Sequence, residues 1–204
     1  MNTNKFYVGF TVIICLVWFI FTACAKPYHF YVKYNVPESM GQSLQNKVYL
    51  KVIDGRQTDN FLSEKARNEF DLWDGTFALY YSEKKPKSAV DTYSLTALIR
   101  VIMTQRLGSK GILVSEQQSA GEAILEMTLK KLYLELKDRN WISDISFEVA
   151  LSSDNMKTGR ETVSGKAERT KFMGRGAGEI LVSELLTDTI NRLDIEKLFK
   201  NAGL

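Results

Sequence analysis

Two cysteines and one histidine carry the most versatile side-chain chemistry in this chain, and their positions limit its use. Cys15 lies within an uncharged apolar run, and Cys24 follows that run directly after Ala23. If the chain is cut before Cys24 and that thiol is modified, no cysteine remains for thiolate catalysis, a disulfide or a zinc site. His29 stands alone, and we expect it in a linker, without the partners of a Ser-His-Asp or Cys-His mechanism. Ser-Lys and carboxylate-only sites are not excluded by counting, but no tight cluster suggests them. We therefore expect no enzyme, no metal site and no cofactor.

The N-terminal segment predicts what happens to Cys24. Lys5 precedes residues 6–23, which contain no charged side chain and match the n-region and h-region of a signal peptide. Small Thr22 and Ala23 stand before Cys24, as signal peptidase requires near its cut, and the segment resembles a lipobox. This resemblance puts a thioether lipid on Cys24, with cleavage between Ala23 and Cys24 and palmitate among the expected acyl groups. The apolar run is also near the roughly 17–25 residues of a membrane-spanning helix, so a retained anchor is one alternative and simple secretion another.

The residue after Cys24 indicates to which membrane a lipoprotein would be sorted. In the enteric sorting systems that this signal resembles, an aspartate at that position retains a lipoprotein in the inner membrane, whereas Ala25 stands here. The expected location is therefore the outer membrane of a bacterial cell envelope, with the chain facing the periplasm.

Charge gives little sign of a polyanionic partner. The chain has 27 Lys and Arg against 24 Asp and Glu, and loss of Lys5 on cleavage leaves a net charge near +2. The charges are scattered in local mixtures such as residues 64–67, unlike the basic face of a nucleic-acid binder. The basic run at residues 83–87 is interpreted as a solvated turn, with a contact to anionic lipid headgroups as the alternative. No nucleic-acid partner is expected.

Three further residues are candidates for contact with a partner. Trp73 and Trp141 fall between expected elements, where exposed aromatic side chains can bind a partner, although packing over the end of a core is the simpler interpretation. Arg175 belongs to the glycine-rich residues 174–178, which could hold an anion at the start of a helix. Their spacing matches neither a P-loop nor a dinucleotide fingerprint, so a flexible strand-to-helix joint is favoured.

Alternation and helical periodicity predict the elements that must position these residues. Strands are expected at residues 48–53, 77–81, 112–114, 123–137, 145–151 and 161–171, with a short helical excursion within 59–70. Leucines change phase from odd to even positions within 123–137, which predicts a β-bulge near Lys130 and Lys131. The weak hydrophobicity of 161–171 suggests an edge strand. Amphipathic helices are expected to begin near Leu95 and Gly176, followed by a short helix capped by Asp194.

These elements predict an α+β fold, with two main amphipathic helices packed on one face of a mostly antiparallel sheet. Residues 1–23 are expected to be the signal peptide and residues 24–46 the lipidated N-terminus and a tether. Residues 47–204 are expected to be a single periplasm-facing domain, a size that can bury its own core.

Short stretches in this order resemble the YajG-like envelope lipoproteins. They are the lipobox cysteine, Asp54-Gly55-Arg56 and Thr58-Asp59 after the first strand, Arg106-Leu107-Gly108 at the end of a helix, and residues 184–190. The resemblance covers most of the mature chain and implies a small periplasm-facing α+β domain. It implies no established enzymatic activity and therefore no catalytic residues. In architecture the chain is also similar to the auxiliary lipoproteins of envelope ABC-type lipid transport systems.

Two functions are expected from these observations. The first is a non-catalytic binding or scaffold module, anchored by the lipid on Cys24, that contacts another envelope protein through the edge strand near 161–171 or the aromatic side chains. The second is an auxiliary lipid-binding component of an envelope ABC-type transport system, which would hold an apolar tail between sheet and helices.

Overall fold

The structure of the protein is a computed structural model that describes residues 28–38, 44–82, 84–86, 91–153 and 157–204. The strands are β1 (Tyr28–Lys33), β2 (Lys47–Asp54), β3 (Trp73–Tyr80), β4 (Thr92–Tyr93), β5 (Leu113–Ser115), β6 (Ala123–Lys137), β7 (Asn140–Ser152) and β8 (Thr158–Thr170). The helices are α2 (Glu64–Glu69), α3 (Leu95–Gly108), α4 (Gly176–Asn191) and α5 (Ile195–Ala202). The predicted signal peptide, the predicted cleavage site at Ala23 and the predicted lipidation site at Cys24 lie outside the described residues.

The strands form two sheets, and both are mixed. The larger sheet has the order β5-β2-β6-β7-β8, and its three longest strands form an antiparallel meander. Its second strand, β2, runs parallel to both β5 and β6. The α+β prediction is confirmed, but the pairing is mixed rather than purely antiparallel.

The predicted β-bulge in β6 is confirmed. The register between β6 and β7 shifts between Leu129 and Lys131, so the chain gains one residue on β6. The shift lets odd-numbered leucines before it and even-numbered leucines after it enter the same core, because an extra residue exchanges the two faces of a strand. The edge position of β8 in the larger sheet is confirmed as well.

The domain begins earlier than Lys47. The expected tether of residues 24–46 includes β1, which runs parallel to β3 in the second sheet, of order β1-β3-β4. Phe30, Val32 and Tyr34 are buried. Burying each large apolar side chain contributes about 1.5–3 kcal/mol, so this segment is part of the core rather than a linker.

Aromatic rings join β1 to the segment that precedes β3. The Phe30 ring lies 5.0 Å from Phe61, 5.1 Å from Phe70 and 5.8 Å from Phe77, measured between centroids, and the pairs are tilted or edge-to-face. These are favourable geometries for aromatic pairs. Phe61 and Leu62 are buried as expected, and they lie just before the predicted short helix α2.

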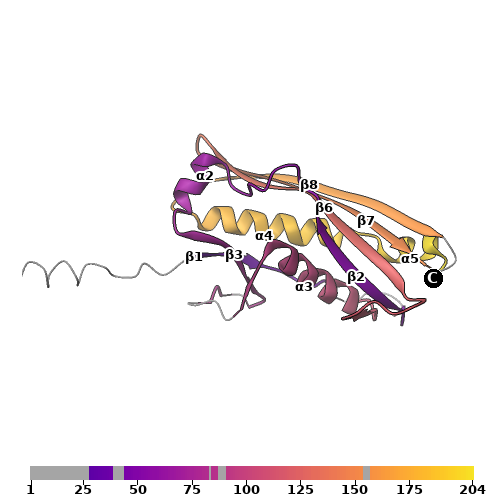
Figure 1. Cartoon of the computed structure of the whole chain (residues 1–204). Coiled ribbons are helices and arrows are strands. Elements are labelled where there is room, and N and C mark those ends of the chain that lie inside the picture. Colours follow the sequence, from indigo (N-terminus) through magenta and orange to yellow (C-terminus); the bar gives the residue numbers. More distant parts are fainter. Residues whose placement is uncertain (1–27, 39–43, 83, 87–90, 154–156) are drawn as a thin grey trace, which may run out of the picture.

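The main helices lie on the larger sheet, as predicted, and α4 is also covered from its other side. It packs on β7 and β8, and it contacts β1 as well (Figure 1). Ser94 and Asp194 cap α3 and α5 by accepting backbone N–H bonds. In the described part of the chain, no helix has the length and apolarity needed to cross a membrane.

Candidate functional site

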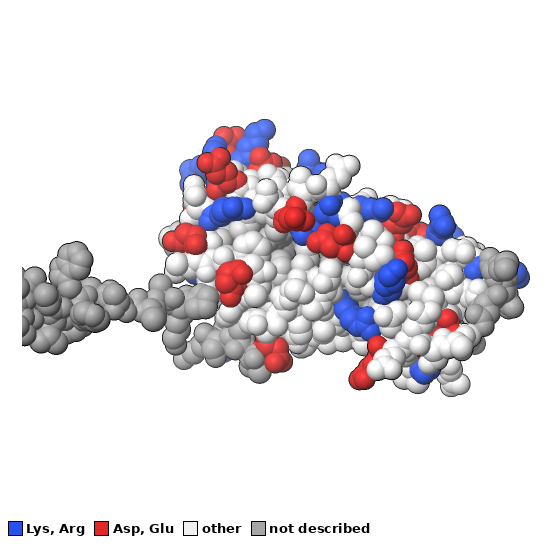
Figure 2. Space-filling model, viewed as in Figure 1, with Lys and Arg blue, Asp and Glu red and all other residues white. Residues whose placement is uncertain are grey.

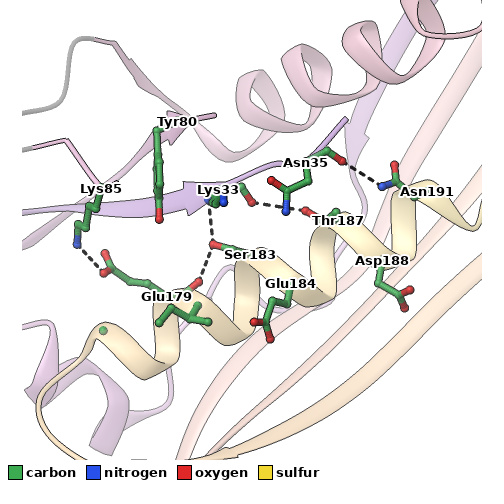
Figure 3. A pocket seen from close by; sticks show the side chains of 12 residues that line it. Lys33, Asn35, Tyr80, Lys85, Glu179, Ser183, Glu184, Thr187, Asp188 and Asn191 are labelled. Carbon is green, nitrogen blue, oxygen red and sulfur yellow. Dashed lines mark hydrogen bonds and ion pairs between the residues drawn. The ribbon is translucent and has the colours of Figure 1, made fainter. Parts of the chain in front are cut away.

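Four polar side chains of α4 face the open edge of β1. They are Glu179, Ser183, Thr187 and Asn191, each four positions after the previous one, and we call them the α4 ladder. Each bonds a main-chain group of β1 or of the residues just after it, and Figure 3 shows these bonds for Ser183, Thr187 and Asn191. The bonds run from Tyr31 N to Glu179 Oε1 (2.8 Å), from Lys33 N to Ser183 Oγ (3.0 Å), from Thr187 Oγ1 to Lys33 O (3.5 Å) and from Asn191 Nδ2 to Asn35 O (3.2 Å).

The ladder works because two repeats coincide. Four residues of an α-helix rise about 6 Å, and two residues of a strand rise about 6.6 Å. A helix running beside a strand can therefore present side chains to successive outward-facing main-chain groups, and here the four side chains reach residues 31, 33 and 35, with Lys33 bonded through both its N–H and its C=O. β1 is an end strand of its sheet, and an exposed edge is a template for unwanted pairing. The α4 ladder provides hydrogen-bond partners for outward-facing main-chain groups at this edge, so no further strand is needed to pair with them.

Glu179 is the most heavily bonded member of the ladder. It is buried, and its carboxylate accepts hydrogen bonds from the Tyr28 hydroxyl and the Tyr31 main chain. Lys85 Nζ lies 2.6 Å from the Glu179 Oε2 atom and 4.0 Å from the centroid of the Tyr31 ring. A buried carboxylate requires such partners, because an unpaired buried charge is strongly destabilising.

Two tyrosines beside the α4 ladder have raised pKa values. Burial raises the pKa of the Tyr28 phenol well above its usual range, and the hydrogen bond to Glu179 adds to the effect because phenolate would repel the carboxylate. Burial also raises the pKa of Tyr34 to about 12. The Tyr34 hydroxyl donates to Asn191 Oδ1 at 2.9 Å. Both phenols therefore act as neutral donors at ordinary pH.

A cleft of about 690 Å³ opens along the α4 ladder, between α4 and β1 (Figure 3). Its volume lies within the roughly 300–1,000 Å³ typical of ligand sites. Lys33 and Lys85 line it together with the acidic Glu184 and Asp188. Tyr80 of β3 and the exposed Ile180 of α4 contribute apolar surface. The cleft can therefore offer charge of both signs, hydrogen-bonding groups and substantial apolar surface.

The three candidate contact residues have different environments. Trp141 is 0% exposed and lies in β7, because the hairpin turn uses only the two residues before Asn140, so it presents no surface to a partner. Trp73 is half-buried at the start of β3, and its indole N–H donates to Thr76 O at 2.7 Å. Arg175 lies over the Tyr28 ring, 3.4 Å from its centroid, close to Glu179 but not among the residues that line the cleft.

The glycine-rich segment 174–178 lets the chain turn before α4 and lets α4 pack closely against β7. Gly174 has a φ of +61°, a conformation that favours glycine. A Cβ on Gly178 would lie 3.1 Å from the Trp141 ring, so the missing side chain allows α4 to approach β7. The Gly178 and Glu179 N–H groups bond the Arg175 carbonyl at 2.9 Å and 3.4 Å. The strand-to-helix joint is the better interpretation.

His29 lies in β1 rather than in a linker. Its Nδ1 atom is 2.7 Å from Thr76 Oγ1 and 3.3 Å from Asp74 Oδ2. A catalytic triad needs its two partners on different ring nitrogens, whereas both contacts here use Nδ1. The arrangement therefore ties β1 to β3 without forming a proton relay. Among the described residues, no group of three or more His, Cys, Asp or Glu side chains is placed to hold a metal ion.

Charge on the visible face has no single sign. Figure 2 shows Lys and Arg mixed with Asp and Glu over this face. Ion pairs among the described surface residues include Lys131 with Asp144 and Lys130 with Glu148. This face therefore resembles a solvated surface more than a polyanion-binding one.

The α4 ladder was not predicted from the sequence, although the sequence contains a signal for it. Residues four apart on a helix share a face, and the polar side chains at 179, 183, 187 and 191 form a stripe beside the apolar face of Val182, Leu185 and Leu186. Serine, threonine and asparagine in such a stripe, in place of lysine, are a signal for buried hydrogen bonding.

Comparisons with known proteins give only distant likenesses. No protein-family model and no curated protein matches the chain. Solved structures with similarity include a Xanthomonas campestris protein of the DUF330 family, with 10% identity, a TM-score of 0.47, and coverage of 80% of this chain and 91% of that one. A minor lipoprotein from Acinetobacter baumannii has 9% identity, a TM-score of 0.37, and coverage of 76% and 97%. A lipoprotein from Neisseria meningitidis has 14% identity, a TM-score of 0.29, and coverage of 72% and 99%.

All three TM-scores are below 0.5, so these likenesses carry no argument about what this chain does. None of the three is described as YajG-like, and that resemblance stays a prediction. The assignment as a lipoprotein rests on the residues before Cys24.

Proposed function

We propose that this chain is a lipid-anchored envelope lipoprotein, and that it acts as a non-catalytic binding module whose site is the cleft between α4 and β1. The occupant that suits this cleft best is an extended polypeptide segment of another envelope protein. One observation carries the proposal: an open cleft of about 690 Å³ lies along a row of side chains that already bond the main chain of an extended strand.

The groups of the α4 ladder retain hydrogen-bonding capacity for such a segment. The Ser183 hydroxyl donates to Glu179 O and accepts from Lys33 N, and a hydroxyl oxygen can accept a second hydrogen bond. The Asn191 amide has two N–H donors, of which Asn35 O uses one. Polypeptide main chain supplies the matching donors and acceptors at the spacing that the ladder already fits.

Charge also favours a polypeptide. Glu184 and Asp188 are paired with arginines at 2.5 Å and 3.1 Å, on the exposed side of α4. Exposed pairs of this kind contribute about 0–1 kcal/mol, so a ligand can exchange them at low cost. A segment with basic and acidic side chains would find partners of the opposite sign in Glu184, Asp188 and Lys33.

The lipid-carrier function has less support. An acyl chain between sheet and helices would need the space that Leu181, Val182 and Leu185 occupy, where they are buried against the larger sheet. Protein interiors of this kind are close-packed, and inserting even a methylene costs about 1–3 kcal/mol. The apolar surface of the cleft is interrupted by charged side chains such as Lys85, Glu184 and Asp188, which suits a lipid tail poorly.

A non-catalytic role is supported by the loss of free thiols that the proposed processing would cause. Cleavage before Cys24 removes Cys15, and the lipid occupies the remaining thiol. The outer membrane, facing the periplasm, is the proposed location, and it rests on the lipobox-like segment and Ala25.

Photocrosslinking in cells tests the proposal. A photoreactive amino acid at Ile180, an exposed position that lines the cleft, should give a reproducible adduct with one envelope protein. The same substitution at Leu113 is the control, because Leu113 is 69% exposed in β5, at the opposite edge of the larger sheet from β8. Glu184→Lys, which reverses a charge of the cleft, should reduce the Ile180 adduct. Equal adducts at both positions, or none at Ile180, would contradict the proposed site, and an adduct with the mass of a lipid would favour the carrier.

A further inference from the structure

The lipid anchor stands only four residues before the folded domain. β1 begins at Tyr28, and the Tyr28 N–H donates to Leu72 O at 2.8 Å, so the domain is fixed from this residue onward. Four residues span at most about 14 Å when fully extended. If Cys24 is lipidated, as the proposed function requires, the end of the domain that carries Tyr28 must lie at the bilayer surface.

That end of the domain also carries the start of α4. Arg175 lies directly before α4 and packs 3.4 Å from the centroid of the Tyr28 ring. Figure 1 shows α2, the start of β1 and the start of α4 together at this end, away from the C-terminus. The segment between β8 and α4, residues 171–175, is therefore held next to the point where the anchor joins.

This segment has an apolar tip. Phe172 is 84% exposed and Met173 is 90% exposed, the highest values among the large hydrophobic side chains of the described residues. Leu72, whose carbonyl accepts the Tyr28 bond, is also exposed at 46%. Single exposed apolar residues are ordinary on protein surfaces, but adjacent ones held beside a membrane anchor point to a contact.

The residues around the tip are suited to lipid headgroups. Lys171 and Arg175 flank Phe172 and Met173 in the chain, and basic side chains beside an apolar contact favour an anionic membrane surface. Lys171 Nζ lies 2.5 Å from Glu69 Oε1, and its main-chain N–H donates to Arg139 O at 2.7 Å, so the base of the segment is fixed. The tip is therefore presented on a rigid base.

We infer that Phe172 and Met173 form a second membrane contact, which inserts into the interfacial region of the bilayer that holds the Cys24 lipid. A protein partner at the tip is less favoured, because the four-residue connection leaves little room for one between this end and the membrane. The contact would fix the orientation of the domain, with the α4–β1 cleft beginning at the membrane and running away from it.

Depth-dependent quenching tests the inference on the full lipidated protein. The protein is reconstituted in vesicles of phosphatidylethanolamine and phosphatidylglycerol, some carrying a spin label near the headgroup. An environment-sensitive dye is attached at Phe172→Cys, at Met173→Cys or at the control Leu113→Cys. Since the thiol of Cys24 is blocked by its lipid, each variant offers one site for labelling. The dye at 172 or 173 should shift to the blue and be quenched severalfold more than the dye at 113.

The outcomes separate the inference from the proposed function. Failure of the protein to float with the vesicles would overturn the lipid anchor and, with it, the orientation that depends on it. Co-flotation with a dye at 172 quenched no more than the dye at 113 would overturn only the second contact. As an independent check, Phe172→Ser with Met173→Ser should reduce the quenching of a dye at Leu72→Cys, whereas Leu113→Ser should leave it unchanged.

Discussion

Replacing Glu179 by alanine should destabilise the domain far more than any exposed carboxylate of the same helix would. The substitution removes the carboxylate oxygen that accepts hydrogen bonds from the Tyr31 N–H and from the Tyr28 hydroxyl. A buried donor left without an acceptor costs about 1–3 kcal/mol, which applies to the Tyr31 main chain. The half-buried Tyr28 hydroxyl can regain water, so it adds about 0.5–1 kcal/mol. We therefore expect Glu179→Ala to lower the free energy of unfolding by about 2–4 kcal/mol.

Two matched variants isolate the cause. Glu179→Gln keeps an oxygen that can accept both hydrogen bonds but loses the ion pair with the partly exposed Lys85, so its cost should be about 1 kcal/mol. Glu184→Ala removes an exposed carboxylate five residues along α4 that pairs with Arg169, and its cost should be about 0–0.5 kcal/mol.

Urea unfolding followed by tryptophan fluorescence measures these differences, because Trp73 and Trp141 lie in β3 and β7 of the domain. With a slope of about 2 kcal/mol/M, the midpoint should fall by about 1–2 M for Glu179→Ala. A midpoint equal to that of Glu184→Ala would refute the account of the α4 ladder.

Three further substitutions probe the packing and charge of the described residues. Gly159→Ala places a Cβ atom 2.2 Å from Leu198 O, so α5 must shift, and urea unfolding should show a loss of about 1–3 kcal/mol, whereas an unchanged midpoint would contradict this approach of α5 to β8. The hydrogen bonds from Arg56 hold the pKa of Asp54 below its ordinary value of 3.8, so this pair stabilises the folded state above that pH and loses its effect as pH falls through the lowered pKa. Asp54→Asn should therefore cost about 0.5 kcal/mol at pH 7, this cost should shrink as pH falls below 3.8, and a pH-independent difference would contradict the cause. Burial raises the pKa of Tyr28 above its ordinary 10.0, so the stability of the folded state should fall as pH rises above 10, and Tyr28→Phe should weaken that fall in a pH series of thermal unfolding.

The parts of the fold that local pattern determines could be predicted from the sequence. The helical period correctly predicted that α4 begins near Gly176, and Asp194 was correctly predicted to cap α5. The phase change of the leucines in β6 predicted the bulge. Each of these features is recorded in residues close together in the chain.

The role of β1 could not be read in the same way. Its parallel pairing with β3 joins segments more than 40 residues apart. Its position after the predicted signal peptide suggested a tether, although the apolar and aromatic run from Phe30 to Val32 is typical of a buried strand. Trp141 was expected between elements but lies in β7, because the hairpin turn before it is shorter than the sequence suggested, and its burial agrees with the packing interpretation favoured for it.

The candidate site depended on this non-local arrangement. The cleft needs β1 beside α4, and each contributes polar groups that look like ordinary surface residues in the sequence. Only the packing of α4 along β1 brings Ser183 to the main chain of β1 and Asn191 to the main chain of Asn35, just after it.

The intact mass of the mature protein extracted from the envelope tests the central claim most directly. A binding module held at the membrane by Cys24 predicts a chain that begins at Cys24 and carries the mass of a thioether-linked lipid. An unmodified chain that begins at Met1 would contradict the anchor, the short connection to β1 and the orientation of the cleft together.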